Sequence, residues 1–592
     1  MESKSYTTER GCQILISLMK QNNIKKIITS PGATNVTFVG SVMNDPFFEV
    51  FSSVDERSAA YMAVGMAEET GEVIVLSCTG ATASRNYIPG LTEAFYRKLP
   101  ILAITATQNI NRVGHLIPQV IDRSQSLKDI CVLSEYIPVP HDGDTEWDVT
   151  IRCNRAILAL RHRGGGPVHI NLMSESERDF SVKELPVARC IKRYTLCDNE
   201  FPQMPLGRVG IMVGSHLPWT ENQVRAIDRF CNAYGAIVYC EHGSNYSGKY
   251  RVNLSIINQQ QFYSREQYLT DVLIHIGEVT AYGNTKCEMT KQVWRVNEDG
   301  ELRDPMRKLK NIFEMREEDF FNRYADMAQC TQDRSLQQAN GAIWLKECRE
   351  RSEEIRSLIP ELPLSNIWIA SQTAPRLPED CYLHIAILNS LRAWNMFEVP
   401  LSVRSQGFAE TGGFGIDGCM SAMIGGSMVF PNKLHFLVIG DLAFFYDLNS
   451  LGNRHIGANV RILLINNGKG TEFRNYNHPA ARFGDEADRF MAAAGHFGNK
   501  SKSLVRHYAE DLGFEYMQAS TKEEFLDQID HFLTPSLTKC PMLLEVFTNS
   551  EDESNALKIV NTLKQDAKGK LKKVAMQILP QHIVDKAQKA LK

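Results

Sequence analysis

Short apolar runs recur along this chain, and stretches with helical spacing of apolar positions separate them. The clearest runs end near residues 28, 78, 105, 213, 276, 439 and 465, and most are followed by glycine or short polar residues. Continuous apolar strands that alternate with helices are typical of parallel sheets covered on both faces. The pattern therefore predicts an α/β fold built from doubly wound parallel sheets.

Polar residues follow two of these runs in the last third of the chain. Asp441 comes after the run 434–439, and Asn467 comes after the run 460–465. Parallel neighbouring strands end at the same edge of a sheet, so both side chains should face one crevice. Carboxylate and amide oxygens suit Mg²⁺, and a helix that begins near Leu442 would offer N–H groups to phosphates. The sequence predicts a metal and diphosphate site at this edge.

The spacing of this pair adds to the evidence. The chain has Gly-Asp at 440–441 and Asn-Asn at 466–467, with 25 residues between Asp441 and Asn467. This pattern resembles the signature of thiamine-diphosphate (ThDP) enzymes. Ordinary polar strand ends in a doubly wound sheet are the alternative. The resemblance implies that Mg²⁺ is held by Asp441, the Asn467 side chain and the backbone carbonyl of Lys469. It also implies that three neighbours line the cofactor: Gly440, Leu442 and Ala443.

A second motif lies near the N-terminus, where Glu56 begins a stretch rich in small residues, 59–67. Taken alone, Glu56 would be a solvated first-turn residue favoured by the helix dipole. The segment resembles the first-domain motif of ThDP enzymes, in which this Glu bonds N1′ of the aminopyrimidine ring. That chemistry needs a carboxyl in an apolar site, where it shares a proton with the ring. The resemblance implies that Glu56 is catalytic and drives formation of the cofactor ylid.

Further landmarks follow in the order found in this family. They are the loop 28–34, the turn after the run 73–78, the helix that follows it, the segment 389–391 and the glycine segment 412–418. The resemblance implies that these segments line the cofactor, with Ile416 as the apolar support that bends it. The corresponding candidate cofactor-binding residues are Gly32, Thr79, Gly80, Asn86, Ser390, Gly415 and Ile416.

A length of 592 residues suggests three domains. We expect a pyrimidine-binding domain over 1–185, a middle α/β domain over 205–330 and a diphosphate-binding domain over 362–550. In the middle domain we expect parallel strands at 209–213, 272–276 and 293–297. This domain has no Gly-x-Gly-x-x-Gly fingerprint, so dinucleotide or flavin binding is not supported.

Residues 556–592 contain nine lysines and spaced apolar positions, which predicts a basic amphipathic helical tail. Such a tail could be a lid over the active site, or a docking segment for a partner or an anionic membrane. It could also be helices packed on the body with a solvated lysine face.

Bulk properties exclude several classes of protein. The formal charge of −4 carries no nucleic-acid signature, and no apolar run is long enough to span a membrane. The start of the chain lacks the layout of a signal peptide. The fourteen cysteines include no Cys-x-x-Cys pair, so we expect reduced thiols in a cytoplasmic protein.

The domain order resembles the acetolactate synthase and pyruvate decarboxylase branch of ThDP enzymes. Within this branch, the local resemblance is to the menaquinone-pathway synthase that adds a 2-oxoglutarate-derived unit to isochorismate. Its substrate-binding arginines do not carry over, because this chain has Thr34, Thr411 and Trp394 in their places. These side chains cannot make the bidentate bonds of an arginine to a carboxylate.

Six residues are expected to face the substrate: Asn35, His115, Gln119, Ser390, Thr471 and Glu472. Gln119 lies where relatives place a Gln that reaches the reacting centre. Glu472 is a candidate acid or base, although Phe473 is the residue that aligns without a gap. His115 is either a structural loop histidine or a catalytic group. No His-His pair of the simple decarboxylase type is present, which disfavours plain aldehyde release.

These observations predict a ThDP- and Mg²⁺-dependent decarboxylase or carboligase that passes the acyl unit of a 2-oxo acid to an acceptor. The alternatives are a menaquinone-type 1,4-addition synthase with an altered pocket and a simple 2-oxo acid decarboxylase. A non-catalytic scaffold is disfavoured because Glu56, Asp441 and Asn467 are retained. The family builds its active site between subunits, which implies a homodimer or homotetramer.

Overall fold

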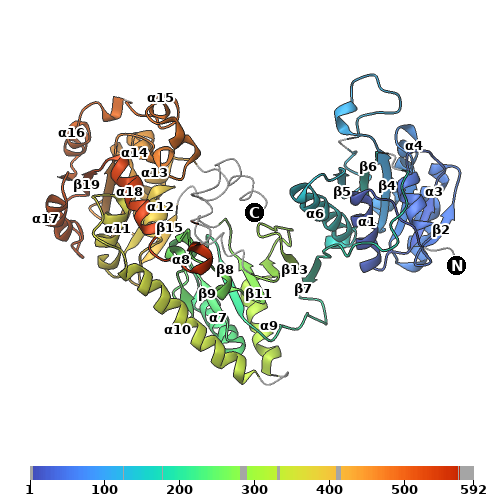
Figure 1. Ribbon diagram of the computed structural model, residues 1–592, viewed down its shortest axis with the longest axis horizontal. Helices are drawn as coiled ribbons and strands as arrows, with labels where there is room; N and C mark the ends of the chain where they lie inside the picture. The colour runs from blue at the N-terminus through green and yellow to red at the C-terminus, as the bar shows by residue number, and fades with distance from the viewer. Residues whose placement is uncertain are drawn as a thin grey trace. The chain divides into compact units, whose positions relative to one another are not determined.

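The computed structural model describes residues 4–123, 126–175, 178–279, 290–329, 334–407, 415–495, 497–570 and 573. The chain forms two compact units (Figure 1). The first unit comprises Met1–Tyr194 with Gly300–Ile312, and the second comprises Thr195–Asp299 with Phe313–Lys592. Together they contain three α/β sheets, which confirms the predicted fold class.

The sheet of the first unit has the order β2-β1-β3-β4-β6-β5, and its neighbouring strands are parallel. Its strands are β1 (Lys26–Thr29), β2 (Glu49–Ser52), β3 (Ile74–Cys78), β4 (Ile101–Thr107), β5 (Leu133–Ile137) and β6 (Val168–Met173). Its helices are α1 (Arg10–Gln21), α2 (Val36–Val42), α3 (Glu56–Thr70), α4 (Thr82–Asn86), α5 (Ile88–Tyr96) and α6 (Gly143–Ala159).

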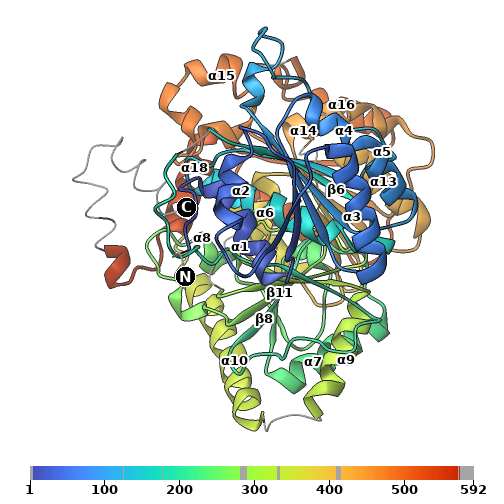
Figure 2. The same ribbon diagram turned by 90° about the vertical axis from the view of Figure 1, so that its right-hand side faces the viewer.

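Both faces of this first sheet are covered. Successive strand residues point to opposite faces, so Ile27 joins one apolar core and Ile28 joins the other. Helices α1, α2 and α6 lie on one side and α3, α4 and α5 on the other (Figure 2). This arrangement explains why the strands read as continuous apolar runs in the sequence.

The middle sheet has the order β10-β9-β8-β11-β12-β13-β7. The predicted strands are confirmed as β8 (Val209–Val213), β11 (Val272–Ile276) and β12 (Val293–Asn297). The other strands are β7 (Lys192–Thr195), β9 (Ile237–Tyr239), β10 (Arg251–Val252) and β13 (Leu309–Glu314). The helices in this part of the chain are α7 (Glu221–Tyr234), α8 (Ser255–Gln259), α9 (Glu317–Gln329) and α10 (Ser335–Ser357).

The third sheet has the order β15-β14-β16-β17-β19-β18, and it is also parallel. Its strands are β14 (Tyr382–Ile385), β15 (Arg404–Gly407), β16 (His435–Gly440), β17 (Val460–Asn466), β18 (Glu515–Ala519) and β19 (Met542–Phe547). Its helices are α11 (Asn366–Thr373), α12 (Asn389–Trp394), α13 (Cys419–Val429), α14 (Asp441–Tyr446), α15 (Glu486–Phe490), α16 (Leu504–Asp511), α17 (Lys522–Phe532) and α18 (Ser550–Asn561).

The first and third sheets share one topology. In both, the strands lie in the order second, first, third, fourth, sixth, fifth along the chain. Helix α3 from Ala59 and helix α13 from Cys419 also bury and expose their side chains in the same order over eleven positions. The two parts of the chain therefore share the same strand order and the same pattern of helix burial.

After α18, the described chain continues along the second unit. The Ser264 amide donates to the Asp566 carboxylate at 2.6 Å, and Lys568 forms an ion pair with Glu266 at 2.7 Å. The predicted basic tail lies outside the described residues from 574 onward. Among the helices that are described, none has the length and apolar character needed to cross a bilayer.

Candidate active site

The predicted metal and diphosphate site lies at the carboxyl edge of the third sheet. β16 and β17 are neighbours there, with Gly440 opposite Ile465. Asp441 begins α14 directly after β16 and is only 2% exposed. Its carboxylate accepts a hydrogen bond from the Asn499 amide at 2.6 Å. Asn467 directly follows β17, so the two predicted ligands end adjacent strands of the same sheet.

The donor set of this edge fits a hard cation. Oδ1 of Asn467 is buried and has no hydrogen-bond partner among the described residues. Buried polar atoms normally have a partner, so this oxygen is a candidate ligand atom. No group of three His, Cys, Asp or Glu side chains that could hold a metal occurs in the described part of the chain. One carboxylate with amide and carbonyl oxygens is instead a donor set that Mg²⁺ accepts.

The loop after Asn467 is tightly built. Gly468 has a φ of 79°, which favours glycine, and a Cβ on Gly470 would lie 3.3 Å from Leu442 Cδ1. The loop therefore packs against the start of α14. The ammonium of Lys469 is bound by Asp488 at 2.5 Å. Its side chain is engaged away from the predicted ligands, and the backbone carbonyl is the group that the resemblance assigns to the metal.

A buried carboxyl supports this edge, and the sequence reasoning missed it. Glu545 on β19 is 1% exposed and accepts from the Asn466 amide at 2.6 Å and from the Tyr516 hydroxyl at 2.7 Å. Burial raises the pKa of Glu545, and nearby Asp441 raises it further. The only signal in the sequence was a glutamate inside an apolar strand, which alone does not indicate a partner.

The second predicted end of the site is at the start of α3. Asp55 caps this helix by accepting from the Arg57 amide at 2.9 Å, which leaves Glu56 in the first turn. The Asn86 amide donates to Oε2 of Glu56 at 3.0 Å. Glu56 is half-buried in its unit. The structure thus brings together two residues that the sequence predicted for the cofactor, although they lie on different helices.

The predicted loops of the first unit also meet. A Cβ on Gly32 would lie 2.7 Å from the Cβ of Thr79, and one on Gly80 would lie 2.7 Å from the carbonyl oxygen of Ala106. Side chains at these glycines would have no room. The ends of β1, β3 and β4 therefore converge, as expected for loops around a ligand.

Four of the eleven described non-glycine residues with positive φ lie in or beside the predicted site loops. Positive φ values occur at Ala81, Leu116 and Gln119 in the first unit, at 54°, 56° and 63°, and at Leu388 in the second, at 64°. Such conformations are costly for residues with a Cβ and cluster at functional sites. His115 and Gln119 are exposed on the loop that extends from β4 (light blue in Figure 1). Their side chains do not meet Glu56 through any hydrogen bond among the described residues.

Helix α12 forms a wall beside the third-sheet site. Ser390 is 2% exposed, and Asn389 accepts from the Asn475 amide at 3.2 Å. Nη1 of Arg392 lies 2.6 Å from both carboxylate oxygens of Glu472. The predicted acid or base Glu472 is therefore part of an ion pair. Arg392 was missed in the sequence, where the only signal was a cation two residues after Ser390.

The remaining candidate positions differ in burial, and some lie outside the described residues. Ile416 is half-buried and packs on the core beside α13, as a support for a cofactor would. Trp394 is 1% exposed and belongs to the apolar core. Thr411 and residues 412–414 of the glycine segment lie outside the described residues. The core position of Trp394 agrees with the absence of an arginine there.

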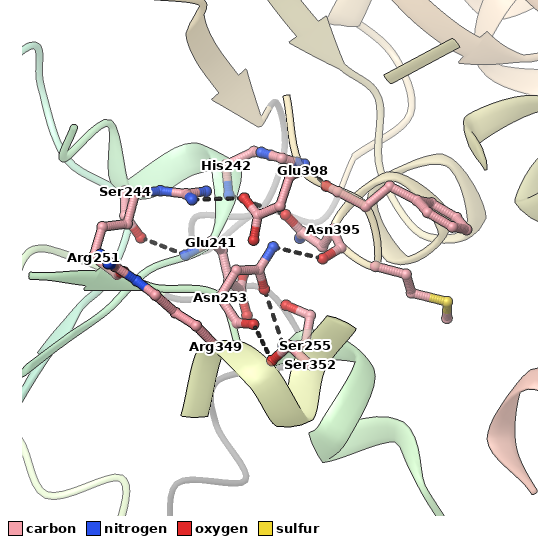
Figure 3. Close-up of polar contacts among 12 residues, drawn as sticks. Glu241, His242, Ser244, Arg251, Asn253, Ser255, Arg349, Ser352, Asn395 and Glu398 are labelled. Carbon is pink, nitrogen blue, oxygen red and sulfur yellow. Dashed lines mark hydrogen bonds and ion pairs between the residues drawn. The ribbon is translucent and has the colours of Figure 1, made fainter. Parts of the chain in front are cut away.

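The end of α12 is clasped by the middle domain (Figure 3). Nε2 of His242 lies 2.9 Å from the Trp394 carbonyl oxygen and 3.0 Å from that of Phe397. Burial, with Arg251 nearby, lowers the pKa of His242 to about 4. The ring is thus neutral at pH 7, and its Nε2–H donates to the two carbonyls. The clasp fixes the helix that carries Ser390.

Further bonds complete this clasp. The Asn253 amide donates to the Asn395 carbonyl at 2.9 Å, and Arg251 pairs with Glu398 at 2.6 Å. Two guanidinium groups, Arg251 and Arg356, lower the pKa of Glu398 although burial acts in the opposite direction. The segment after α12 is therefore held at several points by the middle domain.

Comparison with known proteins identifies the cofactor. Residues 9–126 match the model of the family described as thiamine pyrophosphate enzyme, N-terminal TPP binding domain. The chain therefore contains a thiamine pyrophosphate enzyme N-terminal domain. Thiamine diphosphate and Mg²⁺ are its cofactors, in agreement with the residues that the structure gathers at the two predicted ends.

The chain is also similar to known proteins over most of its length. It is 28% identical to 2-succinyl-5-enolpyruvyl-6-hydroxy-3-cyclohexene-1-carboxylate synthase of Bacteroides fragilis, over 93% of this chain and 98% of the relative. The enzymes of that name from Phocaeicola vulgatus and Porphyromonas gingivalis are 28% and 25% identical, with the same coverage.

Proposed function

We propose that this enzyme decarboxylates a 2-oxo acid and joins the resulting acyl unit to an acceptor, as a carboligase. The observation that carries the proposal is the similarity, over 93% of the chain, to synthases named for a product that bears a succinyl group. The retention of Glu56, Asp441 and Asn467 supports a working cofactor site. The absence of a His-His pair in the sequence supports transfer of the acyl unit to an acceptor over plain aldehyde release.

The residues of the chain would divide the work as follows. Bound ThDP supplies the carbanion chemistry. Glu56 would hold a proton at the pyrimidine nitrogen, with its carboxyl oriented by the Asn86 amide. Asp441, Asn467 and the Lys469 carbonyl would hold the cation that binds the diphosphate. His115 and Gln119, on the exposed loop after β4, would act on the substrate.

A second candidate is the menaquinone-type 1,4-addition synthase with an altered pocket. The names of the relatives favour it, because a succinyl group is what 2-oxoglutarate leaves after loss of CO₂. The replaced substrate arginines count against an unchanged pocket. Turnover of 2-oxoglutarate with isochorismate to a 1,4-adduct would support this candidate over other acceptors. Free aldehyde as the main product would instead support a simple decarboxylase.

We further propose a homodimer or homotetramer with Glu56 and Asp441 contributed by different subunits. Apolar residues exposed on the equivalent helices support it, among them Tyr61 at 49% on α3 and Val429 at 68% on α13. Solution mass measured by light scattering tests the assembly. A cytoplasmic location stays a prediction from the cysteine pattern.

The deciding experiment is a screen of 2-oxo acids with the purified chain loaded with ThDP and Mg²⁺. We expect CO₂ release that rises when an aldehyde, ketone or unsaturated acceptor is added, and a product that contains both carbon skeletons. ThDP binding is measured separately by calorimetry. Bound cofactor without CO₂ release from any 2-oxo acid would overturn the proposal.

A further inference from the structure

A groove of about 700 Å³, the α10 groove, lies on the second unit beside the first half of α10. It is lined by residues that precede β8, β11 and β12, so it is at the amino edge of the middle sheet. Four of its apolar side chains are exposed, namely Leu206 at 61%, Leu269 at 37%, Leu336 at 75% and Ile343 at 56%. Apolar side chains that are exposed together mark a surface on which another segment or molecule packs.

The charged groups of the α10 groove are three carboxylates and two cations, Glu266, Asp271, Glu347, Arg208 and Lys291. Both cations have partners within or beside the groove. The Lys291 ammonium lies 2.6 Å from Asp271, and Arg208 donates to the Gln267 carbonyl. Glu347 pairs with no cation in the described part of the chain. The groove therefore fits an occupant that has apolar side chains and lysines.

The described chain after α18 runs toward this groove. Lys564 forms an ion pair with Glu354 of α10, and four residues later Lys568 pairs with Glu266 at 2.7 Å. Glu266 is itself a lining residue of the groove. Glu347, another lining residue, precedes Glu354 by seven residues, or about 10 Å along the helix axis. The chain thus passes from the middle of α10 to the rim of the groove, and its lysines bind the acids along the way.

Further contacts fasten the chain at this rim. Gln565 forms a parallel bridge with Phe262, and Gly569 lies so close to the Phe262 carbonyl that a Cβ would have no room. The Lys573 ammonium lies 5.6 Å from the centroid of the Phe262 ring. Residue 574 therefore follows a segment that is already held beside the loop that carries Glu266.

Residues 574–592 have a composition that suits the groove. Their apolar residues include Val574, Met576, Ile578, Leu579, Ile583 and Val584. Residues 568–592 contain seven lysines and a single acid, Asp585. Nineteen residues span roughly 28 Å even when fully helical. This reach exceeds the stretch of α10 between Glu354 and Glu347, so the segment is long enough to cover the groove.

We propose that residues 574–592 dock in the α10 groove of their own chain. Their apolar side chains pack on Leu206, Leu336 and Ile343, and their lysines lie beside Glu347. The chain's own segment is the occupant because it is fastened at the rim, and a short tether gives an effective concentration of about a millimolar. This role assigns the basic tail to the body of the second unit, and not to a lid or a membrane.

Limited trypsin digestion of the full chain with ThDP and Mg²⁺ tests the docking, with the cut after Lys586 followed by mass spectrometry. Ile343→Glu places a charge in the docked interface and should speed this cut at least about tenfold. Leu217→Glu is the matched control, since Leu217 is an 80% exposed leucine of the middle domain outside the groove. It should leave the rate unchanged. Thermal unfolding midpoints show whether both variants are folded.

The reciprocal test changes the tail and observes the groove. Ile578→Glu should raise hydrogen exchange in peptides from residues 336–347 about threefold or more. Gln577→Glu adds the same charge at a polar position and should raise it less. Equal cleavage rates in Ile343→Glu and Leu217→Glu would overturn the proposal.

The other possible occupants give different results in the same assay. Wild-type cleavage that is fast alone and slow with vesicles of phosphatidylcholine and phosphatidylserine would show a membrane segment. Protection of 336–347 that rises with protein concentration would show that a second copy covers the groove. Either result would overturn docking within the chain, whereas protection at all concentrations and without vesicles supports it.

Discussion

The first and third sheets place different chemistry on the same frame. Glu56 lies three residues before the first buried position of α3, and Ile416 lies three residues before that of α13. After the third strand of each sheet, Thr79 stands in one and Asp441 in the other. The predicted proton-sharing carboxyl thus lies where the other sheet has an apolar side chain, and the predicted metal-binding carboxylate lies where the first sheet has a hydroxyl. The shared topology places a potential binding edge at the same position in both sheets. A few residues at the strand ends would then decide which part of the ligand each sheet binds.

The comparison is most sharply tested by removing each of the two carboxyls in turn. Glu56→Gln should lower turnover by ~100-fold or more, because the amide cannot share a proton, while ThDP still binds. Asp441→Ala should abolish cofactor retention, because the cation loses its charged ligand. Turnover and calorimetric binding of ThDP with Mg²⁺ are measured for both.

Asp485→Asn is the control, since Asp485 is an exposed carboxylate that pairs, among the described residues, only with Arg474 and lies outside both predicted ends of the site. It should change neither quantity. If Glu56→Gln lost cofactor binding and Asp441→Ala kept it, the assignment of the two ends would be reversed.

The sixth strand of each sheet carries a buried polar residue at the same register, Asn171 opposite Thr105 and Glu545 opposite Leu464. Glu545→Ala should destabilise the protein by about 2–5 kcal/mol, because the Asn466 amide and the Tyr516 hydroxyl lose their acceptor in the core. Urea unfolding measures the change, and Mg²⁺ affinity should fall with it.

Glu545→Gln keeps one acceptor oxygen and should cost less. Asn171→Ala in the first sheet removes only a 3.4 Å bond to the Arg123 carbonyl and should cost least. A larger loss in Asn171→Ala than in Glu545→Ala would contradict the view that the third sheet depends on its carboxyl.

Close helix packing distinguishes two glycines of the first unit. A Cβ on Gly90 would lie 2.5 Å from the Cβ of Ala60, whereas one on Gly65 meets nothing within 4 Å. Gly90→Ala should cost about 1–3 kcal/mol of unfolding free energy through overpacking of α5 on α3. Gly65→Ala should stabilise α3 by roughly 0.5–1 kcal/mol.

Thermal unfolding of both variants gives the sign of each change in stability. Destabilisation by Gly65→Ala would mean that the exposed face of α3 is covered in the assembled protein. That result would support the proposed subunit contact, and unchanged solution mass in the variant would count against it.

Buried histidines make each sheet sensitive to acid. Burial lowers the pKa of His169 in the first unit and of His384 in the third sheet to about 3. The unfolded chain takes up these protons near pH 6.5 and the folded chain does not, so it is the unfolded state that binds more protons below 6.5. Stability is therefore full above pH 6.5 and falls as the pH drops toward 3, by up to about 1.4 kcal/mol per pH unit for each group.

Unfolding midpoints at pH 7.5 and 5 test this dependence. His384→Gln should reduce the loss between these two values, because the group that titrates only in the unfolded chain is gone. A loss of stability between pH 7.5 and 5 as large as that of the wild type would show that other groups dominate the pH dependence.

The apolar strands and the strand-end motifs were predictable because each depends on residues close in sequence. β8, β11 and β12 followed from continuous runs, and Asp441 and Asn467 from their spacing. Arg392 and Glu472 are 80 residues apart, and His242 lies 152 residues from Trp394. Contacts of this kind form only when the sheets have packed, so no local sequence pattern predicts them. Glu545 was missed for the same reason, since its partner Asn466 lies on another strand.

If α12 faces the substrate as proposed, the His242 clasp gives the middle domain a part in selectivity, although its sequence lacks a nucleotide fingerprint. The helix that carries Ser390 and Arg392 is registered by bonds from the loop after β9, so a change of the middle domain would shift that helix. Replacing this domain with that of a relative should therefore alter which acids are accepted before it alters cofactor loading. Substitutions in the middle domain are therefore a way to change substrate specificity from outside the active site.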